Sequence, residues 1–94
     1  MDLIKLVTDE SLDSLKGFVV GEAEDLQQWG TIIAEDAVRA VQAGRYDILS
    51  ELREQVKVVA EMKRIKTQGF AWDQVLNIFL KVAKIAVHAM ELKG

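Results

Sequence analysis

The chain has 94 residues, of which 50% are hydrophobic and 29% are charged, with a formal net charge of −3; this composition excludes a disordered, collagen-like or mucin-like chain and predicts one domain over residues 1–94. The absence of cysteine excludes a disulfide framework, a thiolate nucleophile and any metal site that depends on sulfur. Residues 1–44 carry nine acids and three bases, whereas residues 45–94 carry six acids and nine bases, so a generally basic nucleic-acid domain is excluded and the two halves are expected to pack against each other, within one chain or between two.

The first 21 residues give the least definite pattern. A short helix is predicted over about 8–17, capped by a threonine or an aspartate and ended by a glycine. The apolar runs 3–7 and 18–20 fit either a strand or more helix; we favour helix, and one long kinked helix over 9–43 is an alternative. No cationic leader precedes a long apolar run, so a secretory signal is not expected and a cytoplasmic protein is.

A long helix is predicted over about 22–43, because apolar residues recur there every three or four positions. Three acids lie in its first turn, where the positive end of the helix dipole favours them. Gly44 is expected at the left-handed position that ends the helix. Gly30 lies inside the helix, where it indicates a close helix crossing or a kink. The predicted buried stripe consists of Leu26, Gly30, Ile33, Ala37 and Val41.

A second helix is predicted over about 47–68, with Asp47 as its N-cap and Gly69 at its end. Acidic residues come early in this segment and basic residues late, in agreement with the helix dipole. Ile65 and Phe70 occupy the positions at which a Schellman turn would make its hydrophobic contact. The predicted stripe, with steps of three and four, consists of Leu49, Leu52, Val56, Val59 and Met62 or its neighbour Lys63.

A third helix is predicted over about 72–92, and its polar residues form one narrow stripe. A helix that is apolar on most of its circumference must be buried on most of it, whereas a helix in a three-helix monomer exposes about half its surface. We therefore expect a homodimer or higher homo-oligomer with this helix at its centre. The alternative is that residues 1–21 fold over it as a fourth element. The stripe consists of Asn77, Lys81, Lys84, His88 and Glu91.

Insertion of this helix into a membrane is not expected. A spanning helix needs about 20 predominantly apolar residues with few or no charges. Lys81 and Lys84 lie near the centre of the segment, and each would cost about 2.5–3.5 kcal/mol at the middle of a bilayer.

His88 and Glu91 form a His-x-x-Glu pair on the same helix. Ferritin-like di-iron sites use Glu-x-x-His together with glutamates from other helices. The order is reversed here, and we interpret His88 as part of the solvated stripe. A metal site is therefore not expected at this pair.

Two acidic pairs suggest an alternative chemistry. Glu22 with Asp25, and Glu51 with Glu54, have the three-residue spacing that brings carboxylates to one helix face. The pattern resembles that of all-α nucleotide pyrophosphohydrolases of the MazG type, which hold magnesium with an ExxE pair on one helix and an ExxD pair on the next. The two pairs stand in the opposite order in this chain. The resemblance implies a Mg²⁺- or Mn²⁺-dependent nucleotide hydrolase, whereas acids at helix starts also suit the dipole.

These patterns predict an all-α bundle of three long antiparallel helices plus the N-terminal segment 1–21, in an oligomer. The expected function is that of a small non-enzymatic protein that acts through self-association and contacts with other proteins. We assign no catalytic residue, no cofactor and no metal ligand, and the nucleotide hydrolase remains the alternative. Nucleic-acid binding is not expected; if it occurred, phosphates would contact the basic residues Lys57, Lys63, Arg64 and Lys66.

Overall fold

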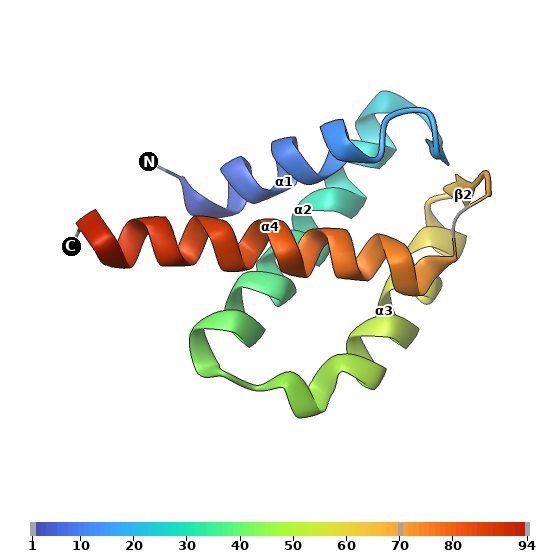
Figure 1. The fold of residues 1–94 in the computed structure, drawn as a ribbon. Coiled ribbons are helices and arrows are strands. Elements are labelled where there is room, and N and C mark those ends of the chain that lie inside the picture. Colours follow the sequence, from blue (N-terminus) through green and yellow to red (C-terminus); the bar gives the residue numbers. More distant parts are fainter. Residues whose placement is uncertain (1, 70, 94) are drawn as a thin grey trace.

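The computed structural model describes residues 2–69 and 71–93. Within them the chain forms four α-helices, one 3₁₀ turn and two short antiparallel strands (Figure 1). The predicted all-α class is confirmed. The architecture differs from the predicted bundle of three long helices because residues 3–14 form a separate helix and a small two-stranded sheet is present. The elements are α1 (Leu3–Ser14), β1 (Val19–Val20), α2 (Ala23–Ala43), η1 (Tyr46–Ile48), α3 (Leu49–Met62), β2 (Lys66–Thr67) and α4 (Trp72–Lys93).

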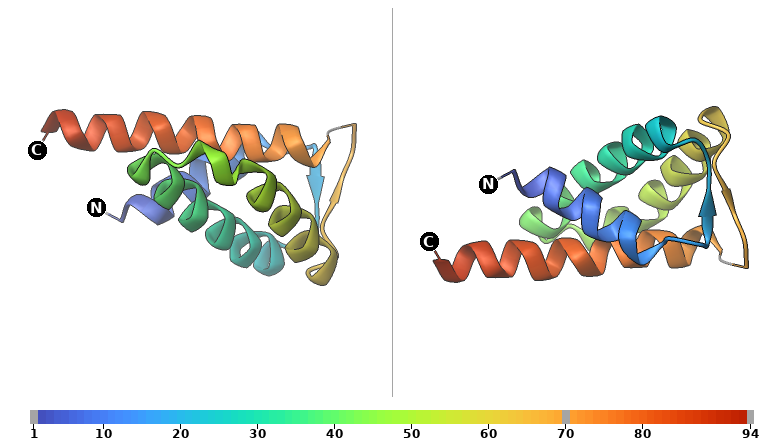
Figure 2. Two further views of the ribbon diagram at one scale, coloured as in Figure 1. Left: turned by 90° about the horizontal axis from the view of Figure 1, so that it is seen from below. Right: turned by 90° about the horizontal axis from the view of Figure 1, so that it is seen from above.

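Helix α4 runs the length of the molecule and forms one outer side of it. The other three helices all lie behind it, with α1 and α3 on opposite sides (Figures 1 and 2). The start of α1 and the end of α4 lie at the same end of the molecule, and the two-stranded sheet of β1 and β2 lies at the other end. The molecule is elongated, with principal extents of 38 × 27 × 20 Å.

Helix α1 begins earlier than predicted. Its N-cap is Asp2, whose carboxylate accepts a hydrogen bond of 3.1 Å from the backbone N–H of Lys5, so the prediction of a cap at residue 8 or 9 is wrong. The apolar run 3–7 supplies the first turns of the helix, and Val7 is fully buried. The alternative of one helix over 9–43 is also wrong, because the chain turns at Gly17 (φ +92°) and enters β1.

Helix α2 confirms the predicted segment and its end. Gly44 is left-handed, with φ +65°, and the N–H of Arg45 donates to the carbonyl of Ala40 at 3.0 Å. Gly30 marks a close helix crossing, as one of its two interpretations predicts: a Cβ built there would lie 3.1–3.2 Å from side-chain atoms of Leu12. The missing side chain lets α1 approach α2.

Helix α3 ends six residues before the predicted end at Gln68. Arg64 adopts the left-handed conformation, with φ +57°. The backbone N–H of Arg64 donates to the backbone carbonyl of Glu61 at 3.2 Å, and the backbone N–H of Ile65 donates to the backbone carbonyl of Ala60 at 2.8 Å. These two bonds form a Schellman motif at Met62–Ile65, after which the chain extends into β2 and pairs with β1.

The other predicted boundaries of α3 change accordingly. Gly69 (φ +76°) turns the chain after β2 and does not end a helix. Asp47 lies within η1 and pairs with Arg45 instead of capping α3. Met62 is 76% exposed, so the predicted stripe is not buried at that position. The predicted contact of Phe70 lies outside the described residues.

The core is built around aromatic side chains from α2 and α4. Trp29 and Phe79 are fully buried and pack edge to face, with ring centroids 5.7 Å apart. Trp72 is half-buried and contacts Trp29 in a similar geometry at 6.0 Å. Helix α1 and its C-cap residue add Val7 and Leu15 to this core, and the helix packs against α4. The N-terminal segment is therefore a fourth element over α4, and the expected oligomer stays a prediction.

Candidate functional site

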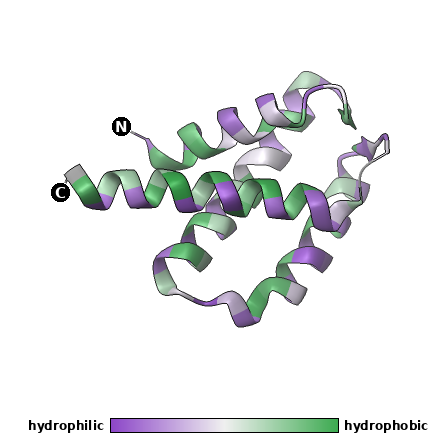
Figure 3. Cartoon of the chain, viewed as in Figure 1, coloured by the Kyte–Doolittle hydropathy of each residue, from purple (hydrophilic) through white to green (hydrophobic). Residues whose placement is uncertain are grey.

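The outward face of α4 carries an apolar stripe in addition to the one in the core. Its members follow each other at steps of four, three, four and three residues, the heptad spacing of helices that pair with other helices. Ile85 is 62% exposed and Leu92 is 76% exposed, while Ile78 and Val82 are half-buried. The apolar and polar residues on this side of α4 are visible in Figure 3. This outer stripe consists of Ile78, Val82, Ile85, Ala89 and Leu92.

The predicted polar stripe runs beside the outer stripe, one residue before each of its members. All five polar residues, from Asn77 to Glu91, are exposed as predicted. The sequence pattern did not show that apolar residues share the outward face with them. The missing information was which side of α4 faces the core, since the helix has apolar residues on both sides. The core side consists of Val75, Leu76, Phe79, Leu80, Ala83, Ala86 and Val87.

The two flanks of the outer stripe differ in charge and in neighbours. On the polar flank, the ammonium of Lys84 lies 4.8 Å from the centroid of the Tyr46 ring, and Asp73 pairs with Arg53 of α3 at 2.9 Å. This flank therefore faces η1 and α3. Helix α1 lies on the opposite side of α4 (Figures 1 and 2), so its exposed side borders the other flank.

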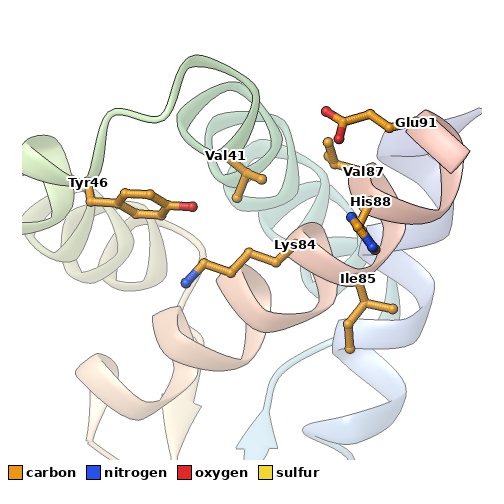
Figure 4. Close-up of a pocket in the computed structure, with 7 residues that line it drawn as sticks. All are labelled: Val41, Tyr46, Lys84, Ile85, Val87, His88 and Glu91. Carbon is orange, nitrogen blue, oxygen red and sulfur yellow. The ribbon is translucent and has the colours of Figure 1, made fainter.

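An open groove of about 480 Å³ lies between α4 and the end of α2. Its walls combine the polar stripe of α4 with Val41 and Tyr46 (Figure 4). His88 and Glu91 both line it beside Lys84. Among the described residues, no group of three or more histidines, aspartates and glutamates is placed to hold a metal ion. The groove therefore combines the ammonium of Lys84, the imidazole of His88, the carboxylate of Glu91 and the ring of Tyr46.

The structure does not bring the two predicted acidic pairs together. Glu22 and Asp25 lie at the start of α2, where they line a groove of about 520 Å³ with Met62 and Lys63 at the end of α3. Since α2 and α3 are antiparallel, Glu51 and Glu54 near the start of α3 lie toward the other end of the pair. Asp25 and Glu51 stand in the first turns of their helices, where the helix dipole favours them.

The predicted basic run is divided between three elements. Lys57 is exposed on α3, whereas Lys66 lies in β2. The ammonium of Lys63 donates to the side-chain carbonyl of Gln28 at 2.7 Å, and Arg64 forms the turn. Two of these cations line the groove that holds Glu22 and Asp25. Acids therefore lie beside these cations, and a uniformly basic surface for phosphates is not formed there.

Asp36 is the acid most affected by burial in the described part of the chain. Desolvation between α2 and α3 raises the pKa of its carboxyl group above the ordinary value. A hydrogen bond with Gln55 and the nearby charge of Arg39 oppose this rise. Within the described residues its Oδ2 has no hydrogen-bond partner. Asp36 is therefore a half-buried carboxylate whose desolvation is only partly offset by its polar and charged neighbours.

Comparison with family models, with curated proteins and with solved structures found no match. The described helices include none that is long and apolar enough to cross a membrane.

Proposed function

We propose that this chain is a small non-enzymatic helical protein that acts through protein–protein contacts, and that it associates with itself through α4. The observation that carries the proposal is the outer stripe of α4, with heptad spacing and two large aliphatic side chains more than 60% exposed. Isolated exposed aliphatic residues are common on protein surfaces, whereas aligned ones mark contact surfaces. A second helix would fit this row by inserting its own side chains between them.

The position of the outer stripe supports the same proposal. It lies on the outermost helix, and the three other helices all pack on the opposite side of α4 (Figure 2). A partner can therefore reach the exposed part of the stripe, from Ile85 to Leu92, without any rearrangement of the fold. Half-buried Ile78 and Val82 continue the stripe toward the start of α4 and would lengthen the contact.

The test is the mass of the protein in solution for the wild-type chain and for Ile85→Lys. The wild type is expected at twice the mass of one chain or at a higher multiple. Ile85→Lys is expected at the mass of one chain with unchanged helix content, because residue 85 contributes little to the core of its own chain and a lysine would be buried against the partner. Absolute mass by light scattering on a sizing column, at two concentrations, measures both.

The matched control is Val58→Lys, which replaces an aliphatic residue of α3 that is 52% exposed. It changes charge and surface hydrophobicity in the same way but lies off the outer stripe, so the mass should stay that of the wild type. A wild-type chain that elutes at the mass of one chain at both concentrations would contradict self-association. Dissociation by both substitutions would show that the effect is not specific to α4.

A further inference from the structure

We infer that the partner of the outer stripe is a second copy of this chain whose α4 runs parallel to the first, about a two-fold axis along the helices. This inference rests on the proposed function and adds the direction of pairing and the charged contacts that select it. The evidence is the difference between the two flanks of the outer stripe. One flank carries lysines of α4, and the other is bordered by acids of α1.

Helix α1 runs antiparallel to α4 (Figure 1), and this determines where along the length of α4 each acid of α1 lies. At one end, Leu3 lines a small groove with Val87 and Met90. At the other end, Leu12 packs at Gly30, next to Trp29, and Trp29 contacts Phe79 and Trp72. Residues between Leu3 and Leu12 therefore lie at the same level along the helix axis as the central turns of α4.

Glu10 is the acid of α1 best placed to reach across the outer stripe. It lies seven residues after Leu3 and four after the half-buried Leu6, so the three share the side of α1 that is turned toward α4. Glu10 is exposed, and its height is within about one helical turn of Lys81. Asp13, one turn further along α1, adds a second exposed carboxylate on the same side.

The symmetry of the pair decides which flanks meet. If two α4 helices pair in parallel about an axis along their length, each copy's α1 flank lies against the lysine flank of the other copy. Glu10 then faces Lys81 of the second copy, and the same contact occurs twice. If the helices pair antiparallel, α1 meets α1 and lysine meets lysine, which places like charges together. Electrostatic complementarity therefore selects the parallel arrangement.

The parallel arrangement also accounts for the uneven distribution of charge between the acidic residues 1–44 and the basic residues 45–94. Within the described residues no ion pair joins the acidic first 44 residues to the basic remainder; the pairs are Glu35–Arg39, Arg45–Asp47 and Arg53–Asp73. Glu10 and Lys81 are exposed in the single chain. A parallel pair brings these opposite charges of the two halves together between copies.

The first experiment reverses the charges. Glu10→Lys and Lys81→Glu should each weaken dimerisation by about tenfold, since each converts two exposed attractions into repulsions. The double variant with both changes in one chain should return close to the wild-type dissociation constant, and an equimolar mixture of the two single variants should form a mixed dimer. Glu54→Lys and Lys57→Glu on α3 are the matched controls and should leave the constant unchanged. Dissociation constants are measured by sedimentation equilibrium at low salt.

The second experiment measures the direction of pairing directly, using the absence of native cysteine. In a parallel pair, Ile78→Cys should crosslink to itself through a short bis-maleimide, because residue 78 faces residue 78. In an antiparallel pair centred on Ile85, residue 78 faces residue 92, about 21 Å away from the other residue 78. A mixture of Ile78→Cys and Leu92→Cys chains would then give the mixed crosslink instead.

The outcomes separate this inference from the proposed function. A dimer that crosslinks at residue 78 and responds to charge reversal supports both. A dimer whose crosslink joins residue 78 to residue 92, or whose affinity is unchanged by Glu10→Lys and Lys81→Glu, overturns the parallel arrangement and leaves self-association intact. A wild-type chain that has the mass of one chain overturns the two together.

Discussion

At the scale of single residues, Arg64 is the most unusual position of the described chain. It is left-handed, with φ +57°, at the turn that ends α3, and this conformation costs a non-glycine residue about 1 kcal/mol or more. Arg64→Gly should therefore raise the free energy of unfolding by about 0.5–1 kcal/mol, after the greater freedom of glycine in the unfolded chain is subtracted. The expected rise in Tm is about 4 °C in a thermal melt followed by circular dichroism.

The control for this prediction is Arg64→Ala. Alanine removes the same exposed side chain and keeps the unfavourable left-handed backbone, so it should give no gain in Tm. If the alanine variant gained as much as the glycine variant, the side chain and not the backbone would be the cause.

Arg64 also explains why the end of α3 could not be predicted. A glycine is the usual sequence signal for a left-handed helix end, and Gly44 gave the correct end of α2 for that reason. Arginine gives no such signal, so the sequence pattern points to the next glycine, Gly69, instead. The strand that follows pairs residues 66–67 with residues 19–20, far away in the sequence, and no local pattern contains that pairing.

At the scale of elements, the crossing of α1 over α2 depends on Gly30. Alanine inside a helix is usually favoured over glycine by about 1 kcal/mol. A Cβ at residue 30 would lie 3.1–3.2 Å from Leu12, so Gly30→Ala should instead lower the free energy of unfolding by about 1–2 kcal/mol because the crossing is overpacked. Urea denaturation gives the change, and an unchanged m-value would show that the folded compactness is kept.

A double-mutant cycle identifies the contact responsible. In a Leu12→Ala background the crossing has room for the added methyl group, so Gly30→Ala should become stabilising by about 0.5–1 kcal/mol, the normal preference of a helix. A loss of equal size in both backgrounds would mean that Leu12 is not the side chain that Gly30 accommodates.

The elements show what sequence periodicity can predict. The segments 22–43 and 72–92 were correct because each is long, strongly periodic and bounded by glycines or acids. Helix α1 is ambiguous in the sequence because its first turns, residues 3–7, are four apolar residues around one lysine, which fit a strand as well as a helix. Packing against α2 and α4 together decides the outcome. The same limit applied to the outer stripe, since spacing predicts a face but not the neighbour that covers it.

At the scale of the whole molecule, the fold divides into a layer of three helices and one outer helix. Three helices bury one side of α4 (Figure 2), and its other side presents the apolar outer stripe beside the polar stripe, which contains two lysines. The sequence predicted the excess apolar surface of this helix correctly but assigned too much of it to a partner, because α1 covers a share. The remaining exposed part, centred on Ile85, is a narrow row that matches one further helix.

This division predicts how stability depends on concentration. If the folded chain pairs through α4, association stabilises the folded state by mass action, and Tm should rise by about 3–5 °C for each tenfold increase in protein concentration. Ile85→Lys removes the pairing and leaves the core of its own chain intact, so its Tm should be the same at all concentrations and equal to that of the wild type at high dilution. Thermal melts across a hundredfold concentration range measure both chains. A wild-type Tm that does not change with concentration would mean that contacts within one chain alone determine the stability of the molecule.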